Sequence, residues 1–205
     1  MVALVTDPGL AEHLIAERRA TGADRHDEVW DGVYVMSPMA NNEHQDLGTG
    51  IVTVLRIVIQ WTALGRVFGG VNVTDQDEDN WTQNYRCPDL AVYLVGTTAI
   101  DRGTHWFGGP DFGAEIVSPY DKTCDKFDFY ESVNARELLI VDRDPWALEL
   151  YRLQEGSLVL VGKSTVNDEA FLRSEVLPLS FRLIADDDRP RIEILHHDGQ
   201  QRWVV

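Results

Sequence analysis

Three residues in the middle of the chain have types and spacing that could together hydrolyse a phosphodiester bond: Asp89, Glu115 and Lys126. Asp89 follows Pro88 in the apolar segment 87–95, and Glu115 interrupts the apolar run Phe-Gly-Ala-Glu-Ile-Val. A carboxylate in an otherwise apolar strand is costly unless a cation pairs with it. Two carboxylates on neighbouring strands can hold magnesium or manganese, which lowers the pKa of a bound water and shields charge developing on a phosphate.

Lys126 lies eleven positions after Glu115, on the helix expected to follow that strand. If the helix packs back on the sheet, the ammonium could orient or deprotonate the water, or neutralise the oxyanion. The structural alternative is that Asp89 caps a turn, Glu115 pairs with an arginine and Lys126 is a solvated helix residue. Perturbed carboxylates also occur in purely structural ion pairs, so the residue types alone leave both readings open.

The N-terminal elements expected ahead of these residues are a helix and a hairpin. Asp7 followed by Pro8 is typical of a helix start, and Gly22 can end that helix. Asp31-Gly32 between two apolar segments predicts a two-residue hairpin turn. A long helix should then begin at Asn41 or Asn42, with an apolar stripe at helical spacing up to its expected stop at Gly65.

The remaining elements are expected to be mostly strands. Segments 66–74, 87–95 and 112–117 favour strands, and 121–134 suits an amphipathic helix. The runs RELLIVD, ALELYRL and SLVLVGK predict three more strands, and the C-terminus predicts a hairpin around Asp198-Gly199. This order indicates an α/β fold in which helices flank a central mixed sheet, rather than a regular βα alternation.

A family resemblance emerges when the motifs are taken together. Beyond the three candidate residues, the chain contains GVYVMSP, His-Gln at the start of the long helix, PDLAVY, EIVSP, DKFDFY and RELLIVDRDPWALELY. This pattern resembles the Uma-two family of restriction endonucleases, within the PD-(D/E)xK nuclease superfamily. The resemblance covers about residues 24–155, and its central run from Pro88 to Tyr151 is the specific part.

The resemblance implies a restriction-endonuclease-like fold and metal-dependent phosphodiester hydrolysis. Asp89 matches the family's first acidic residue and Glu115 its second. The wider superfamily places its lysine two residues after that glutamate, where this chain has Val117. Uma-two proteins carry the lysine on the next helix, which Lys126 matches, and Lys122 is the nearby alternative.

Two further positions match the family. Glu28 matches an acidic residue that enters the first hairpin, and His44 matches a histidine at the start of the long helix. Either side chain could serve as an outer metal ligand or a phosphate contact. The structural alternatives are a turn carboxylate and a helix-capping imidazole.

Composition bounds the class of protein. The chain has 205 residues, 44% hydrophobic and 25% charged, which is typical of a globular protein with a substantial core. We expect a single domain over 1–205, with the family-like core at about 24–155 and a β-rich C-terminal extension over 156–205. Two cysteines, neither in a CxxC motif, are too few for a disulfide framework. No segment approaches the ~20 apolar residues of a membrane span, and no leader peptide is evident, so we expect a cytoplasmic protein without membrane association.

The net charge of −16 argues against tight DNA binding, because nucleic-acid-binding proteins usually present a basic surface. A DNA-cleaving protein would need a basic cluster near its site, for which the candidates are Arg86, Arg102, Lys122, Lys126, Arg136 and Arg143. The leading hypothesis is a magnesium- or manganese-dependent DNA endonuclease, expected to be a homodimer by analogy with its superfamily. The alternative is a non-catalytic interaction or dimerisation module that retains the nuclease fold. A two-carboxylate glycosidase is a third class, but nothing in the sequence places a sugar groove.

Overall fold

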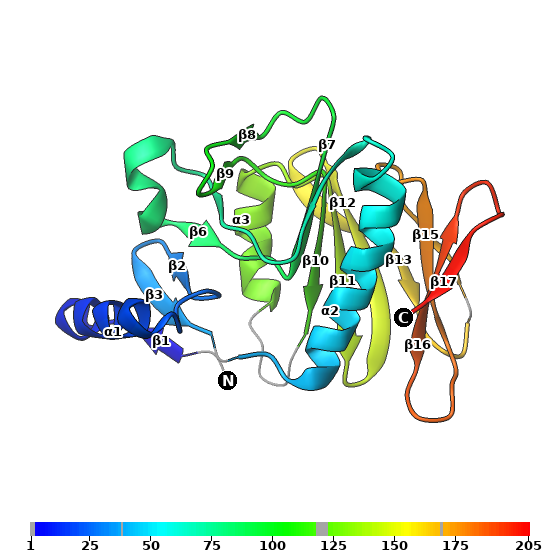
Figure 1. Cartoon of the computed structure of the whole chain (residues 1–205), viewed down its shortest axis with the longest axis horizontal. Helices are drawn as coiled ribbons and strands as arrows, with labels where there is room; N and C mark the ends of the chain where they lie inside the picture. Colours follow the sequence, from blue (N-terminus) through cyan, green and yellow to red (C-terminus); the bar gives the residue numbers. More distant parts are fainter. Residues whose placement is uncertain (1–2, 38, 118–122, 169) are drawn as a thin grey trace.

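A six-stranded mixed sheet forms the centre of the chain. The structure is a computed structural model that describes residues 3–37, 39–117, 123–168 and 170–205 (Figure 1). The strand order is β13-β12-β11-β10-β7-β4, and β10 and β11 are parallel while the other neighbours are antiparallel. The strands are β4 (Gly65–Phe68), β7 (Leu90–Leu94), β10 (Phe112–Ile116), β11 (Glu137–Arg143), β12 (Trp146–Gln154) and β13 (Ser157–Ser164).

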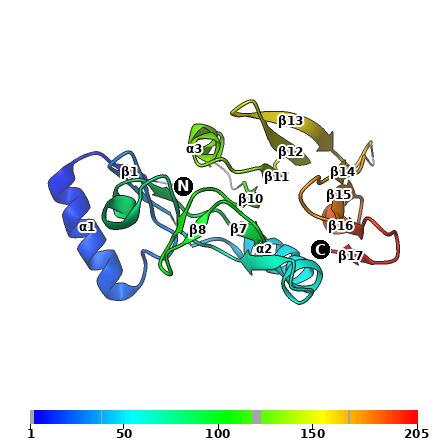
Figure 2. The same cartoon turned by 90° about the horizontal axis from the view of Figure 1, so that it is seen from above.

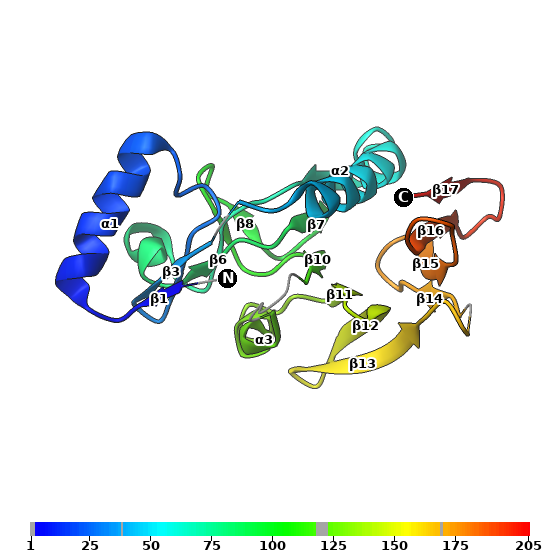
Figure 3. The same ribbon diagram turned by 90° about the horizontal axis from the view of Figure 1, so that it is seen from below.

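Two helices cover opposite faces of this sheet, as Figures 2 and 3 show. On one face lies α2 (Asn42–Leu55), which continues into a π-helical segment, Arg56–Gln60. On the other lies α3 (Phe127–Ser132), which a 3-10 turn precedes at Thr123–Lys126. Successive side chains of each strand point alternately toward α2 and toward α3. Ala114 and Ile116 of β10 join the main core beneath α2, so that Glu115 between them points toward α3.

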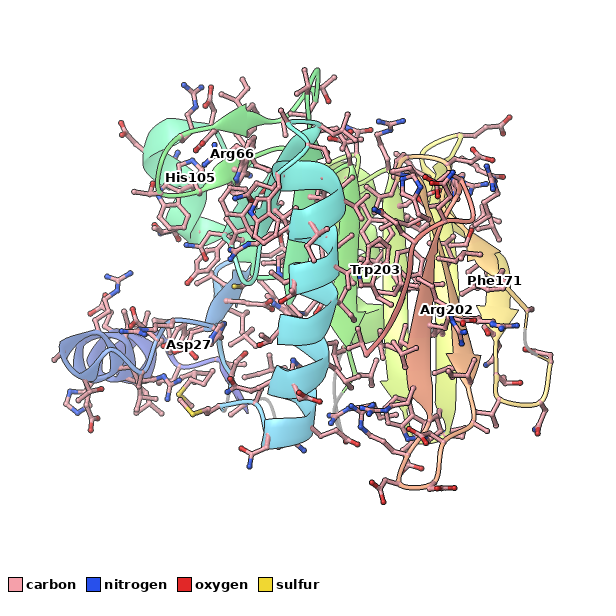
Figure 4. The ribbon with its side chains drawn as sticks, turned by 45° about the vertical axis from the view of Figure 1, so that its right-hand side comes forward. Asp27, Arg66, His105, Phe171, Arg202 and Trp203 are labelled. Carbon is pink, nitrogen blue, oxygen red and sulfur yellow. The ribbon has the colours of Figure 1, made fainter. Side chains whose placement is uncertain are left out.

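A second sheet holds the N-terminal part and stands beside the central one. Its seven strands run in the order β1-β3-β2-β6-β5-β9-β8. They are β1 (Ala3–Val5), β2 (Glu28–Trp30), β3 (Val33–Met36), β5 (Val73–Thr74), β6 (Tyr85–Arg86), β8 (Ile100–Asp101) and β9 (Trp106–Phe107), with a 3-10 helix at Glu78–Gln83. The helix α1 (Pro8–Thr21) packs on this sheet. Asp27, labelled in Figure 4, joins them by accepting hydrogen bonds from Arg18 of the helix and Tyr34 of β3.

The C-terminal segment forms a third sheet that shares the main core. Its strands are β14 (Leu172–Arg173), β15 (Leu179–Ile184), β16 (Arg191–His196) and β17 (Arg202–Val204), in that order across the sheet. Phe181 stacks on Phe112 of β10 with ring centroids 5.6 Å apart. Trp203 packs against the same core, on the side of the sheet toward α2 (Figure 4).

Most predicted elements are confirmed in place. The Asp7 side chain caps α1 by accepting the Leu10 N–H at 2.8 Å, and Gly22 ends the helix with a φ of 68°. Asp31 and Gly32 both have positive φ, 48° and 83°, as the hairpin turn between β2 and β3 requires. The C-terminal hairpin, β16–β17, also forms around the predicted turn, where Gly199 has a φ of 73°.

Three predicted boundaries are wrong. Ala63, with a φ of 61°, makes the left-handed turn after α2, and Gly65 instead begins β4. A Cβ at Gly65 would lie 2.5 Å from the carbonyl oxygen of Tyr93, so that glycine is needed for close strand approach. The predicted strand 66–74 is two strands, β4 and β5, in different sheets. The predicted helix 121–134 is shorter, because its first described residues form the 3-10 turn.

Glu137, at the start of β11, ties the C-terminal sheet to the central one. Its carboxylate is fully buried and accepts hydrogen bonds from Arg152 of β12 at 2.9 Å, the Ser174 hydroxyl at 2.5 Å and the Glu175 N–H at 2.9 Å. Both carboxylate oxygens are therefore used by protein donors. Removing such a buried partner leaves an uncompensated charge.

We expect Glu137→Ala to lower the free energy of unfolding by about 3–5 kcal/mol, because it removes a fully buried carboxylate that accepts hydrogen bonds from the partly buried Arg152 guanidinium, the Ser174 hydroxyl and the Glu175 N–H. Urea denaturation followed by circular dichroism measures the loss. The matched control is Glu149→Ala, since Glu149 pairs with the half-exposed Lys163 at 2.8 Å, a kind of pair worth about 0–1 kcal/mol. Equal losses in the two variants would contradict this role for Glu137.

Candidate active site

The candidate residues meet at one end of β7 and β10. These strands are antiparallel neighbours with Leu90 opposite Ala114, so the next step along the register brings Asp89 beside Glu115. The Ile116 N–H donates to Asp89 Oδ2 at 2.7 Å, which fixes the aspartate at this edge. Asp89 is the more open of the two carboxylates, with 28% of its side chain exposed against 5% for Glu115. The site therefore has a buried floor and an exposed rim.

The two oxygens of Glu115 have different surroundings. Oε1 accepts hydrogen bonds from the Tyr130 hydroxyl at 2.5 Å and from Lys126 Nζ at 3.1 Å. No described residue donates a hydrogen bond to Oε2. One oxygen is thus held by the protein, and the other is available to a ligand.

Burial raises the pKa of Glu115 to about 8. The Lys126 ammonium opposes this shift, whereas the charges of Asp89 and Glu28 add to it. A carboxyl with this pKa holds a proton in part of the population at neutral pH. A divalent cation bound there would displace that proton, as metal binding to protonated ligands does in general.

Lys126 is buried in the 3-10 turn before α3, between two glutamates. Its Nζ lies 3.0 Å from Glu28 Oε1 and 3.1 Å from Glu115 Oε1. Burial alone would lower the pKa of Lys126, but Glu115, Glu28 and Asp89 together raise it well above its ordinary value. The side chain is therefore an ammonium at neutral pH, suited to donate hydrogen bonds and neutralise negative charge but not to remove a proton from water.

Glu28 holds this ammonium in place. Its Oε1 also accepts the Cys87 N–H at 2.9 Å, its Oε2 accepts Trp30 Nε1 at 2.6 Å, and only 3% of its side chain is exposed. Both oxygens are thus engaged by the protein. This arrangement supports a role in positioning Lys126 rather than in binding an ion directly.

His44 approaches Asp89 from the opposite side. It lies in the first turn of α2, where Asn41 caps the helix by accepting the His44 N–H at 2.9 Å. The ring Nε2 lies 2.9 Å from Asp89 Oδ1. His44 is therefore placed to orient Asp89, and its side chain is 13% exposed. Lys122, the alternative to Lys126, lies outside the described residues.

The position of the usual superfamily lysine, Val117, has no site role here. Its N–H donates to the Val141 carbonyl at 2.9 Å, and its own carbonyl accepts a hydrogen bond from Arg143 Nε at 3.0 Å. The backbone of Val117 therefore continues the pairing of β10 with β11 by one residue. Its side chain packs on the core that α3 covers. Lys126 reaches Glu115 from the next helical segment, which is where the family resemblance places the lysine.

Sequence reasoning missed two residues of the site, Tyr130 and Trp30, and named a third, Arg86, only as a candidate for a basic cluster. Tyr130 donates to Glu115, Trp30 donates to Glu28, and Arg86 lies buried beside them with its guanidinium 4.9 Å from the Trp30 ring and 4.3 Å from the Phe129 ring. Tyr130 could have been predicted, since it follows Lys126 by four residues and so shares its helical face. The positions of Trp30 and Arg86 could not, because they depend on the pairing of β2 with β6.

The donors present fit a hard divalent cation. Within the described ranges, no group of three His, Cys, Asp or Glu side chains forms a metal cage. Magnesium does not need one, since it commonly takes one or two carboxylates and completes its shell with water and substrate phosphates. The partly exposed Asp89 and the Oε2 of Glu115, to which no described residue donates, supply that number of oxygen ligands. The sequence-predicted metal ligands are thus brought together.

The predicted basic cluster around the site is not present among the described residues. Arg102, Arg136 and Arg143 are each paired with an acidic side chain, at 2.7, 2.8 and 2.8 Å. Arg86 and Lys126 are buried, and the last candidate, Lys122, is not described. No helix in the described part of the chain has the length and apolar character to cross a membrane.

Comparisons with known proteins identify the family and the fold. Residues 12–201 match the family model described as "Uma2: Putative restriction endonuclease". No curated protein matches the chain. Among solved structures, "a putative nuclease belonging to DUF820" from Anabaena variabilis has 17% identity and a TM-score of 0.58, over 74% of this chain and 82% of that one. This likeness confirms the predicted restriction-endonuclease-like α/β fold.

The raised pKa of Glu115 predicts a pH effect on the metal-free protein. A carboxyl whose pKa is higher folded than unfolded stabilises the fold at low pH, and this contribution falls as pH rises from about 4.5 toward about 8. Relative to wild type, Glu115→Gln should therefore gain stability as pH increases from 5 to 8. Urea denaturation with a chelator present, repeated along this pH series, measures the difference.

Glu149→Gln is the matched control, because hydrogen bonds from Lys163 and Tyr151 outweigh burial and lower the pKa of Glu149. Its stability relative to wild type should change only below about pH 5, and in the opposite sense. A Glu115→Gln difference that stays flat between pH 5 and 8 would contradict the protonated state inferred for Glu115.

Proposed function

The chain belongs to the Uma2 family of restriction-endonuclease-like proteins, and we propose that it is a divalent-metal-dependent endonuclease that hydrolyses phosphodiester bonds in DNA. The observation that carries the proposal is the juxtaposition at the end of β7 and β10. Asp89 and Glu115 lie side by side there, and a buried, permanently charged Lys126 is fixed next to them. In this cluster one oxygen of Glu115 receives no hydrogen bond from the described residues.

Asp89 and Glu115 would hold magnesium or manganese. When bound, that ion supplies a water of lowered pKa and polarises the phosphate. His44 would keep Asp89 oriented through its 2.9 Å contact, and Tyr130 would do the same for Glu115. The protein's own contribution is to fix both carboxylates before substrate arrives, which avoids reorganisation during the reaction.

Lys126 would act as a cation toward the substrate. An ammonium has three N–H donors, and two of them are directed at Glu28 and Glu115. The third is left for a phosphate oxygen or for the attacking water. Because its pKa is raised rather than lowered, Lys126 would stabilise the negative charge of the transition state and not serve as the general base.

The charge of the chain shapes how it would hold DNA. Net charge is −16, and Arg102, Arg136 and Arg143 are already paired with carboxylates. Contact with the phosphate backbone would therefore run largely through the bound cation. Since cutting both strands needs two sites, we also propose that the active form is a homodimer.

The direct test combines metal binding with cleavage. Magnesium and manganese are titrated by calorimetry into wild type and an Asp89→Ala/Glu115→Ala variant, and the same samples are assayed on supercoiled, linear and branched DNA. We expect the variant to lose metal binding and metal-dependent nicking together. Wild type that binds neither ion, with or without DNA, would overturn the proposal and favour the non-catalytic interaction module.

A second variant separates the role of Lys126 from metal binding. Lys126→Ala should reduce cleavage by about 10²–10³-fold, the usual cost of removing one donor to developing charge, while the metal affinity changes only a few-fold. Initial nicking rates and calorimetry on the same preparation measure the two effects. Thermal unfolding confirms that the variant is folded. Cleavage at the wild-type rate would remove Lys126 from the mechanism.

A further inference from the structure

Oε1 of Glu115 has no room for a metal ion. A carboxylate oxygen accepts about two hydrogen bonds, and Oε1 already has two, from Tyr130 at 2.5 Å and Lys126 at 3.1 Å. Oε2 receives none from the described residues. A cation that binds Glu115 through both oxygens would have to displace one of these donors. A cation that binds through Oε2 alone displaces neither.

Tyr130 is the more rigid of the two donors. Its side chain extends from α3 into the core and is fully buried there, and its ring packs edge-on against Phe129 with centroids 5.9 Å apart. Its hydroxyl donates to Oε1 of Glu115 at 2.5 Å, so the buried ring holds this donor in place.

Asp89 is held differently from Glu115. Its Oδ1 lies 2.9 Å from His44 Nε2, and its Oδ2 accepts the Ile116 N–H at 2.7 Å. These contacts hold the carboxylate plane in place, and with one contact from the described residues on each oxygen, both oxygens keep the capacity to bind a cation. The restriction to a single oxygen therefore applies to Glu115.

Divalent cations differ in how they use carboxylates. Magnesium requires six ligands at about 2.0–2.1 Å and takes single carboxylate oxygens and waters, whereas calcium takes about six to eight at about 2.3–2.6 Å and often binds both oxygens of a carboxylate. We propose that Tyr130, with Lys126, reserves Oε1 of Glu115, so that the site accepts magnesium or manganese through Oε2 and discriminates against calcium. Tyr130 is then a specificity-determining residue for the cation. This inference rests on the proposed metal-dependent function.

The test measures cation affinities without any assay of cleavage. Manganese, magnesium and calcium chloride are each titrated by calorimetry into the full chain and into Tyr130→Phe, in the absence of DNA. Wild type should bind manganese and magnesium more tightly than calcium. Tyr130→Phe should narrow the ratio of calcium to magnesium dissociation constants by about tenfold, since a hydrogen bond to a charged group is worth about 1.5 kcal/mol or more.

Tyr151→Phe is the matched control. Its hydroxyl also donates to a glutamate of the central sheet, Glu149 at 2.8 Å, but on β12, two strands from Glu115. This variant should keep the wild-type ratio of dissociation constants. A shift of equal size in both variants would show a general effect of losing a tyrosine hydroxyl, and would overturn the assignment.

The outcomes separate this inference from the function on which it rests. Wild type that binds calcium as tightly as magnesium overturns the selectivity, even if Tyr130→Phe fails to fold, and leaves the nuclease proposal standing. Tyr130→Phe that folds, as judged by circular dichroism, and keeps the wild-type ratio overturns the role of Tyr130 alone. Wild type that binds none of the three cations overturns both.

Discussion

The buried ammonium of Lys126 is the interaction on which the site depends. It lies between Glu28 of the N-terminal sheet and Glu115 of the central sheet, about 3 Å from each carboxylate. Without it, these two glutamates and Asp89 would form a cluster of like charges in a region of low dielectric. The ammonium therefore joins two sheets and makes the carboxylate cluster tolerable at the same time.

Two buried glutamates in neighbouring strands show how a structural carboxylate differs from one suited to function. Glu137 directs both oxygens at protein donors and has no exposed surface, so it has no capacity left for a ligand. Glu115 directs one oxygen at Lys126 and Tyr130 and leaves the other without a described donor. The two glutamates are similarly buried, but only Glu115 has an oxygen that could bind a ligand. What distinguishes the candidate site is therefore the number of carboxylate oxygens that protein donors leave available, rather than the burial of the carboxylate.

The sequence could predict the strands and helices that carry the site, because Pro88, the apolar run around Glu115 and the hairpin turn at Asp31-Gly32 are local signals. It could also pair Asp89 with Glu115, since both interrupt apolar strands. It could not place Glu28 against Lys126, because that contact needs two separate sheets to meet. Nor could it show that Arg102, Arg136 and Arg143 are ion-paired, because their partners lie 25 to 100 residues away in sequence. Local pattern gave the candidate ligands, and long-range packing determines their roles.

The central claim is that Asp89 and Glu115 share one divalent cation while Lys126 keeps its two glutamate partners. Anomalous diffraction from crystals soaked in manganese chloride tests this directly. The account predicts one anomalous peak between the Asp89 carboxylate and Oε2 of Glu115, with Tyr130 and Lys126 still bonded to Oε1. A peak only at other carboxylates, or no peak at saturating manganese, would contradict it.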